Sequence, residues 1–226
     1  MLTVVKVGGG LWRGAGDDAL RSLCRVLGQL GERHPLLVVP GGAGFADAVR
    51  DHDRRFGLRA TISHRMAVLG MEQFGLLLSD LIPGAERCTD LARAGGLADG
   101  RATVLQPARL ALDGLPASWQ VTSDSIAAWV AGQVGADRLV LVKDVDGLFA
   151  EWPARGQPLA RLTAAELAAL RPAGVDAYLP TALERASFET WVIGGRVPAR
   201  VVELFERGTT VGTRIAAAGL LRSKNG

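Results

Sequence analysis

The chain alternates between short apolar segments rich in Val and Leu and longer segments whose apolar residues recur with a helical period. The short segments cover 2–7, 35–40, 102–107, 137–147, 190–195 and 209–215. The helical segments begin at Asp17, Phe45, residue 58, Thr122, Thr163 and Pro198. Strands that alternate with helices favour a parallel sheet covered on both faces, because each helix carries the chain back to begin a parallel strand. The sequence therefore predicts an α/β fold, a three-layer αβα sandwich with a mostly parallel central sheet.

The length and composition indicate a folded protein of ordinary size. A chain of 226 residues is long enough for one domain over 1–226, or for two small lobes around a normal core. Apolar residues make up 48% of the chain, which argues against disorder. No apolar run approaches the roughly 20 residues of a membrane helix. The start of the chain also lacks the charged-then-apolar pattern of a secretory signal. We therefore expect a cytoplasmic protein without a membrane partner.

The basic charge is spread along the chain. The net charge is +3, and the only dense basic group, residues 50–59, is diluted by two aspartates. This pattern does not favour nucleic acid as a partner, whereas a mild positive field suits anionic metabolites equally well. Cys24 and Cys88 form no metal-type pair, and no group of His, Cys and Asp has metal-ligand spacing. We expect reduced thiols and no metal bound by a protein cage.

A lysine and three glycines follow the first apolar segment. Lys6 stands near the end of the expected strand, and Gly8, Gly9 and Gly10 separate that strand from the next helix. Glycines at this point let the backbone approach a ligand and direct N–H groups at an anion. A lysine there supplies charge that can accompany a phosphoryl group during transfer. The spacing matches neither common phosphate-binding fingerprint, and a tight turn with a solvated lysine explains this cluster alone equally well.

A second glycine cluster repeats the same arrangement. Gly41 and Gly42 follow the apolar segment 35–40 and precede a helix. In parallel sheets the carboxyl ends of the strands meet at one edge, where ligands bind. Two such clusters at one edge indicate two phosphate-bearing substrates that face each other.

Five motifs resemble, in order, those of the amino acid kinase superfamily, which includes aspartate, acetylglutamate and uridylate kinases. They are "KVGGG" (6–10), "VPGGAGFAD" (39–47), "TSDSIAA" (122–128), "ADRLVLVKDVDGLF" (136–149) and "VGTRI" (211–215). The resemblance extends from Val4 to Ile215. Within the superfamily, the short length and "PGGAGFADAVR" look most like the (aminomethyl)furanmethanol phosphate kinases of methanofuran-type cofactor synthesis.

The resemblance implies an acceptor over the N-terminal half, about 1–115, and ATP over the C-terminal half, about 116–226. Lys6 would hold the transferring group, and Asp124 would organise Lys6, although an acid at a helix start can also act as a simple cap. The glycines would cradle phosphates, those of ATP at Gly8, Gly9 and Gly10 and those of the acceptor at Gly41 and Gly42. The nucleotide loop would be formed by Lys143, Asp144, Asp146 and Gly147, with the last three near the ribose and adenine. Magnesium would be held mainly by the ATP phosphates.

The sequence departs from the family pattern at two places. Acetylglutamate kinases carry a second catalytic lysine after a late proline, whereas this chain has Thr181 there. Whether Lys143 replaces that charge stays open. The Asp-Pro pair that usually follows the nucleotide loop is replaced by "AEWPARG" (150–156), so the adenine contacts are expected to differ.

Four further residues are candidates for acceptor binding. His64 lies where uridylate kinases place a ribose-binding aspartate, and Arg50 and Arg65 carry charge suited to an acceptor phosphate. Asp47 is the acid nearest in sequence to the second glycine cluster and would bind an acceptor ammonium. Each of the four also fits an ordinary solvated position on a helix.

The sequence favours an ATP-dependent kinase that converts a small phosphomonoester, (5-aminomethylfuran-3-yl)methyl phosphate, into its diphosphate. Three alternatives stay open. A uridylate kinase is disfavoured by His64, and an acetylglutamate-type kinase by the missing second lysine. A non-catalytic, nucleotide-binding storage oligomer of the same fold is disfavoured by the intact Lys6 and Asp124. The resemblance also implies a homo-oligomer.

Overall fold

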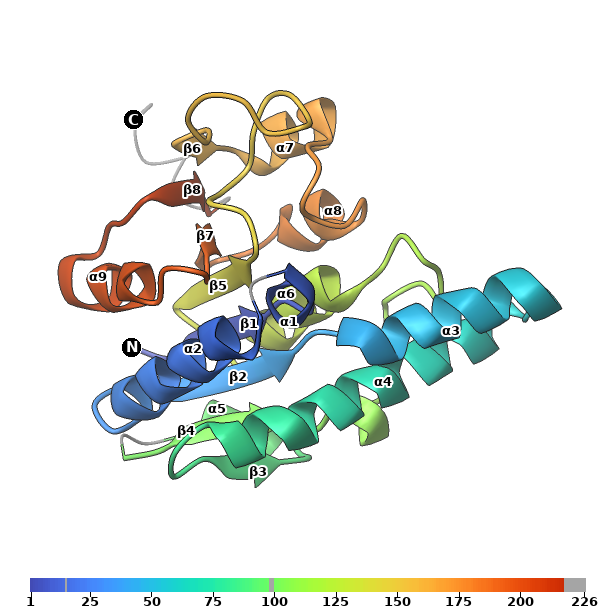
Figure 1. Ribbon diagram of the computed structural model, residues 1–226, viewed down its shortest axis with the longest axis horizontal. Helices are drawn as coiled ribbons and strands as arrows, with labels where there is room; N and C mark the ends of the chain where they lie inside the picture. The colour runs from blue at the N-terminus through green and yellow to red at the C-terminus, as the bar shows by residue number, and fades with distance from the viewer. Residues whose placement is uncertain (15, 98–99, 218–226) are drawn as a thin grey trace.

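The computed structural model describes residues 1–14, 16–97 and 100–217 and contains an eight-stranded sheet (Figure 1). The strands are β1 (Thr3–Val7), β2 (Leu36–Pro40), β3 (Glu86–Cys88), β4 (Ala102–Leu105), β5 (Arg138–Lys143), β6 (Arg161–Leu162), β7 (Glu189–Gly194) and β8 (Gly212–Ile215). Their order in the sheet is β3-β4-β2-β1-β5-β7-β8-β6. Every pairing is parallel except that of β7 with β8. The predicted mostly parallel α/β fold is confirmed.

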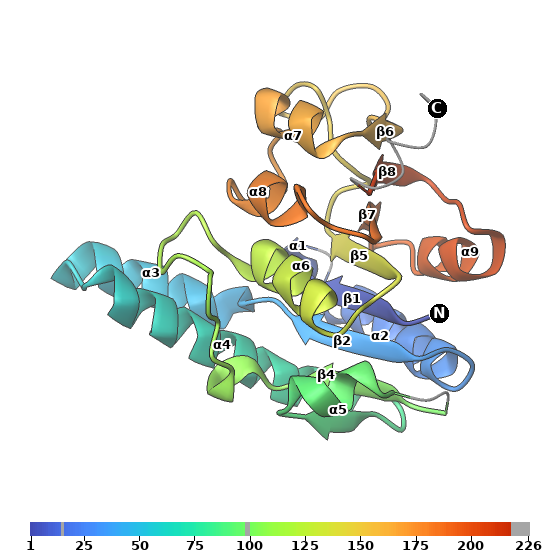
Figure 2. The same cartoon turned by 180° about the vertical axis from the view of Figure 1, so that it is seen from behind.

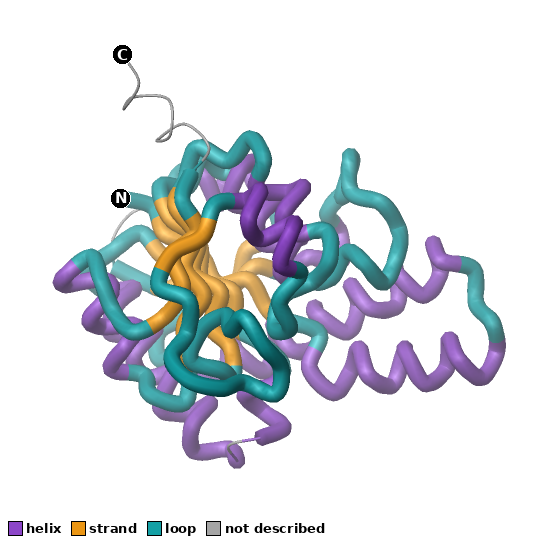
Figure 3. Tube along the Cα trace, turned by 90° about the horizontal axis from the view of Figure 1, so that it is seen from above, coloured by secondary structure: helices purple, strands orange, loops and turns teal. Residues whose placement is uncertain are grey.

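Helices cover both faces of this sheet. They are α1 (Gly10–Gly14), α2 (Gly16–Gly31), α3 (Ala43–Phe56), α4 (Ala60–Leu81), α5 (Leu91–Gly95), α6 (Ser123–Gln133), α7 (Ala164–Leu170), α8 (Leu179–Leu183) and α9 (Ala199–Arg207), with a 3-10 turn at Pro107–Arg109. Helices α2 and α9 lie on one face and α5 and α6 on the other, as the opposite views of Figures 1 and 2 show. The view from above places the strands between the two helical layers (Figure 3). This is the expected three-layer arrangement.

The core divides into two apolar clusters because side chains alternate along each strand. In β1, Val5 packs with Leu23 of α2 in one cluster, and Val4 packs with Ile126 of α6 in the other. All four side chains are at most 2% exposed. Central strands that are buried on both faces carry continuous apolar runs, and for this reason their positions can be predicted from the sequence.

Helices α3 and α4 form a hairpin that projects beyond the sheet (Figures 1 and 3). The chain turns between them at Gly57, whose φ of 60° is in the left-handed region that favours glycine. The second half of α4 covers the sheet through Phe74 and Leu78, which are fully buried. Although α4 has 22 residues, neither it nor another helix in the described ranges is long and apolar enough to cross a membrane.

The long elements begin and end close to their expected positions, whereas several short elements carry no sequence signal. The helix expected over 58–82 is α4, and the one expected over 122–136 is α6. The expected strand 137–147 is shorter, because β5 ends at Lys143. The edge strand β3 has the sequence "ERC" and lacks an alternating apolar pattern. Its position depends on pairing with β4, which is a tertiary contact.

Candidate functional site

A cavity of about 260 Å³ opens where β1, β2 and β5 end. These strands are parallel and in register, with Val7 opposite Pro40 on one side and opposite Val142 on the other. The cavity is lined by the first glycine segment, the start of α3, the first half of α4, the loop before α6, the first turn of α6 and the end of β5. It therefore lies at the carboxyl edge of the sheet, where ligands of open α/β folds bind.

The two glycine segments pack directly against each other at this edge. The N–H of Gly8 donates to the Val142 oxygen at 2.8 Å, and the N–H of Gly41 donates to the Val7 oxygen at 2.9 Å. A Cβ on Gly9 would lie 2.3 Å from the Cα of Ala43, which is closer than any side chain can come. Ala43 itself has a φ of 47°, an unusual value for a residue other than glycine. The backbones of both segments are thus held side by side at this edge of the sheet.

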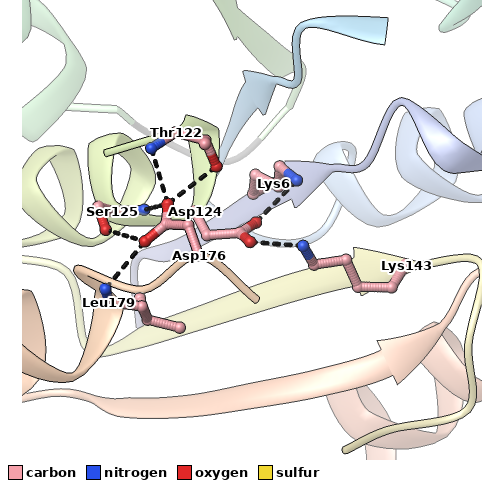
Figure 4. A network of polar contacts seen from close by, with 7 residues as sticks. All are labelled: Lys6, Thr122, Asp124, Ser125, Lys143, Asp176 and Leu179. Carbon is pink, nitrogen blue, oxygen red and sulfur yellow. Dashed lines mark hydrogen bonds and ion pairs between the residues drawn. The ribbon is translucent and has the colours of Figure 1, made fainter. Parts of the chain in front are cut away.

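One carboxylate lies between two lysines at the inner wall of the cavity (Figure 4). The Nζ of Lys6 lies 2.8 Å from Oδ1 of Asp124, and the Nζ of Lys143 lies 2.5 Å from Oδ2. Lys6 projects from the middle of the sheet on β1, Lys143 ends the neighbouring β5, and Asp124 comes from the first turn of α6. The three side chains are between 3% and 12% exposed. This Lys6–Asp124–Lys143 cluster carries a net charge of +1 on side chains that are largely buried.

Burial and mutual attraction set the protonation of the cluster. Burial lowers the pKa of Lys6 to about 8 from 10.5, although the nearby Asp124 raises it. For Asp124, burial acts to raise the pKa, but Lys143 and Lys6 outweigh burial and hold the pKa below its usual range. Asp124 is therefore ionised at neutral pH, and Lys6 is mostly protonated but close to the pH at which it loses its charge.

Asp176 fixes the first turn of α6, and sequence reasoning did not identify it. Its carboxylate accepts five hydrogen bonds (Figure 4). Three come from backbone N–H groups, those of Thr122 at 2.9 Å, Ser125 at 3.0 Å and Leu179 at 2.9 Å. The other two come from the hydroxyl groups of Thr122, at 2.9 Å, and of Ser125. Asp124 makes no such cap, because both of its oxygens face lysines. Asp176 thus caps α6 from another part of the chain and leaves Asp124 available to the cavity.

The α3–α4 side of the cavity is lined by Arg50 and His64, together with Trp119 from the loop before α6. The Arg50 guanidinium carbon lies 5.0 Å from the centre of the Trp119 ring, and the Trp119 Nε1–H donates to Asp53 at 2.5 Å. Burial lowers the pKa of His64, partly opposed by a hydrogen bond with the Ser118 backbone, so the imidazole is neutral at pH 7. Arg50 is therefore the charged group on this side. Trp119 lies in a loop without periodic pattern, and nothing local in the sequence indicates its role.

Other residues expected at the site lie outside the cavity lining. Gly41 is one of them, and its N–H donates to the Val7 oxygen. Asp47 forms an ion pair with Arg50 at 2.9 Å, and Arg65 is exposed on α4. Asp146 forms an ion pair with Arg200 of α9. Gly147, with a φ of 148°, lies against Pro158 and Thr213. The structure thus separates these residues from Lys6, Gly8, Gly9, Gly10, Gly42, Arg50, His64, Asp124, Lys143 and Asp144, which line one cavity.

No group of three or more His, Cys, Asp or Glu side chains that could hold a metal ion occurs within residues 1–14, 16–97 and 100–217. The carboxylates that line the cavity in these ranges belong to Asp124 and Asp144. Hard oxygen donors of this kind suit Mg²⁺, which commonly takes one or two protein carboxylates together with substrate phosphates.

The sequence matches the model of the amino acid kinase family over residues 1–189. A similar characterised relative is the (5-(aminomethyl)furan-3-yl)methyl phosphate kinase of Methanocaldococcus jannaschii, 26% identical over 94% of this chain and 96% of that enzyme. The acetylglutamate kinase of Acidothermus cellulolyticus is 37% identical, but over only 41% of this chain and 34% of that enzyme.

Solved structures of similar fold include two kinases of nucleoside monophosphates. The uridylate kinase of Archaeoglobus fulgidus superimposes with a TM-score of 0.76 over 96% of this chain and all of that chain, at 22% identity. The UMP kinase of Bacillus anthracis gives a TM-score of 0.74 over 94% of each chain, at 17% identity. At these identities the likeness establishes the fold.

Proposed function

The chain belongs to the amino acid kinase family, and on that premise we propose that it is an ATP-dependent phosphotransferase that phosphorylates a small phosphomonoester. The observation that carries the proposal is the Lys6–Asp124–Lys143 cluster beside two packed glycine segments. Phosphoryl transfer requires little covalent chemistry from a protein and depends on positioning and charge neutralisation. The cavity supplies both, with backbone N–H groups for phosphates and two ammonium groups for the charge of the transferring group.

In the proposed reaction, an oxygen of the acceptor phosphate attacks the γ-phosphorus of ATP. The bond from that phosphorus to the β–γ bridging oxygen breaks, ADP leaves and a diphosphate forms. A phosphomonoester has its second pKa near 6, so its oxygen is already ionised at pH 7 and needs no general base.

Lys6 on β1 and Lys143 on β5 would both neutralise the charge of the transferring phosphoryl group. Their ammonium groups share one carboxylate, which fixes both Nζ atoms while leaving a net positive charge toward the cavity. Preorganised charge of this kind stabilises a transition state more than mobile solvent does. Lys143 thereby supplies the second cation that the sequence lacks at Thr181, which favours a catalytic protein over a storage protein.

The phosphates of the two substrates are assigned to the two glycine segments, which lie side by side at the cavity. ATP phosphates would lie against Gly8, Gly9 and Gly10, next to Lys143. The N–H of Gly8 already donates to the Val142 oxygen, which leaves those of Gly9 and Gly10 for the phosphates. The acceptor phosphate would lie at the start of α3, where Gly42 precedes a 14-residue helix whose N-terminal N–H groups favour an anion. Arg50 lines this side of the cavity and adds positive charge. Magnesium, held mainly by the ATP phosphates, would neutralise further charge.

For the acceptor we propose (5-aminomethylfuran-3-yl)methyl phosphate, which is phosphorylated to its diphosphate in methanofuran-type cofactor synthesis. The support is the similarity to the Methanocaldococcus jannaschii kinase over nearly the full length of both chains. The ammonium of this acceptor would need an acidic partner, and Asp47 is the acid nearest in sequence to the second glycine segment. We expect Asp47→Asn to raise the acceptor KM and to leave the KM of ATP little changed. Because Asp47 pairs with Arg50, loss of that pair is part of the expected effect.

We also propose that the protein is a homo-oligomer in the cytoplasm, where ATP is available. Ile62, Leu69 and Leu76 of α4 are 40%, 44% and 44% exposed, and their spacing of seven residues places them in one stripe. A second copy packed antiparallel about Leu69 would bring the exposed Arg59 of one α4 toward the exposed Asp80 of the other. This charge complementarity favours a second copy of the chain as the partner that covers the stripe.

An ADP-release assay with a panel of acceptors tests the proposal. The panel contains the furan phosphate, UMP and N-acetylglutamate, each with ATP and Mg²⁺. Turnover of the furan phosphate, lost in Lys6→Ala, is the expected result. Turnover of UMP alone would overturn the acceptor assignment and keep the phosphotransferase, whereas turnover of N-acetylglutamate alone would overturn the phosphomonoester class. Nucleotide binding without turnover of any of the three would favour a storage protein.

A further inference from the structure

Asp144 is a cavity carboxylate with no role in the proposed transfer step. It follows directly after β5 and lines the cavity together with Asp124. Both oxygens of Asp124 face lysines, whereas no hydrogen bond or ion pair joins the Asp144 carboxylate to any residue of the described ranges. Asp144 is thus the carboxylate of the cavity that is free to meet a ligand.

The Asp144 carboxylate lies against the first glycine segment. A Cβ built on Gly10 would be 2.7 Å from Cγ and Oδ2 of Asp144 and 2.8 Å from Oδ1. Any side chain at residue 10 would therefore displace the carboxylate. Glycine at this position brings a negative charge next to the N–H groups that are assigned to the ATP phosphates.

A carboxylate in this place repels a bare triphosphate. The side chains that line the cavity carry three positive charges, from Lys6, Arg50 and Lys143, and two negative charges, from Asp124 and Asp144, for a net charge of +1. ATP and a phosphomonoester together carry about six negative charges at pH 7. A divalent cation between the carboxylate and the triphosphate turns the repulsion into attraction, because both become ligands of the same ion.

We propose that Asp144 contributes a carboxylate oxygen to the Mg²⁺ that accompanies the nucleotide. The inference rests on the proposed function, because it requires ATP phosphates on Gly8, Gly9 and Gly10. Mg²⁺ takes six oxygen ligands and is typically bound through one or two carboxylates plus phosphates and water. Asp124 is unsuited to this task because two ammonium groups occupy its oxygens. Asp146, two residues further along, is paired with Arg200 and lies outside the cavity lining.

The proposal predicts opposite effects of one substitution with and without metal. Asp144→Asn removes a repelling charge, so the metal-free protein should bind adenosine 5′-(β,γ-imido)triphosphate about threefold or more tightly than the wild type. The same substitution removes a metal ligand, so Mn²⁺ should bind the nucleotide complex at least tenfold more weakly. A residue with a merely structural role would change both affinities in the same direction.

Mn²⁺ is a paramagnetic substitute for Mg²⁺, and its binding to the nucleotide complex is measured by electron paramagnetic resonance. Calorimetry without metal gives the nucleotide affinity, and circular dichroism confirms that the exposed substitution leaves the fold intact. Asp144→Glu keeps a carboxylate and should retain much of the Mn²⁺ affinity. Glu184→Gln removes an equal charge at an exposed position outside the cavity lining and should leave the Mn²⁺ affinity of the complex unchanged.

The outcomes separate this inference from the proposed function. Wild-type protein that binds Mn²⁺ and nucleotide together, with Asp144→Asn unchanged in both affinities, would overturn the role of Asp144 and keep the phosphotransferase. An equal loss of Mn²⁺ affinity in Asp144→Asn and Glu184→Gln would also overturn it, because the effect would then be one of general charge. Wild-type protein that binds no nucleotide under either condition would overturn both proposals.

Discussion

Replacing Asp176 by Ala tests whether the cluster depends on an anchor outside it. Asp176 accepts hydrogen bonds from Thr122, Ser125 and Leu179 and thereby holds the first turn of α6, which carries Asp124. The substitution deletes the acceptor of five donors at once. Asp124 itself keeps its side chain, so any loss of activity comes from its position.

The size of the effect follows from these contacts. Loss of one helix cap costs roughly 0.5–2 kcal/mol, and a hydrogen bond to a charged group contributes about 1.5–3 kcal/mol. The contributions of one carboxylate are not additive, and water reaches the partly exposed Asp176. We therefore expect the free energy of unfolding to fall by about 3 kcal/mol. For a chain of this size that corresponds to a loss of about 6–12 °C in Tm.

The assay combines urea unfolding with steady-state kinetics. We expect the kcat of Asp176→Ala to fall by about 100-fold, because a shift of about 1 Å in a positioned group can cost that much. Asp90→Ala is the matched control: Asp90 caps α5 by accepting from the Ala92 N–H at 2.9 Å and does not line the cavity. It should lose about 1 kcal/mol and keep its kcat. A stability loss in Asp176→Ala without a change in kcat would refute the positioning role.

Three further predictions concern the cations and the α4 stripe. The kcat/KM for ATP should fall as the pH rises through about 8, because the free enzyme then loses the proton of Lys6. Lys6→Arg should move this fall to higher pH. A kcat/KM that stays constant up to pH 10 would contradict the role of Lys6. Lys143→Met should lower kcat by about 100-fold or more, whereas Arg161→Met, at an exposed position, should leave kcat unchanged. An equal loss of kcat in both variants would refute a specific role for Lys143. Leu69→Glu should reduce self-association in sedimentation, whereas Glu at Val197, equally exposed at 44%, should not.

The parts of the site that were predictable from sequence are those formed by local backbone. Gly8 and Gly41 follow buried strands, and parallel strands place such segments at one edge. The resemblance implied that Lys6 and Asp124 act together, and the structure places them 2.8 Å apart. The role of Lys143 was left open, and its contact with Asp124 depends on the neighbouring positions of β1 and β5.

The parts that were not predictable depend on contacts between distant segments. Asp176 is 51 residues from Ser125, and its own surroundings show no motif. Trp119 reaches the cavity because its loop meets Asp53 of the projecting hairpin, 66 residues away. The sequence grouped Asp144 with Asp146, since both stand in one short motif. In the structure Asp144 lies against Gly10, whereas Asp146 pairs with Arg200. The backbone changes direction after β5, and such a change leaves no periodic pattern in the sequence.

The transfer of labelled phosphate from ATP tests the central claim most directly. ATP labelled in its γ-phosphoryl group is incubated with the protein, Mg²⁺ and (5-aminomethylfuran-3-yl)methyl phosphate, and the products are separated. Our account predicts that the label appears in the furan diphosphate, that unlabelled ADP forms in equal amount, and that Lys6→Ala and Asp124→Asn lose both products. Label found only in inorganic phosphate, or transfer that survives in Lys6→Ala, would contradict the account.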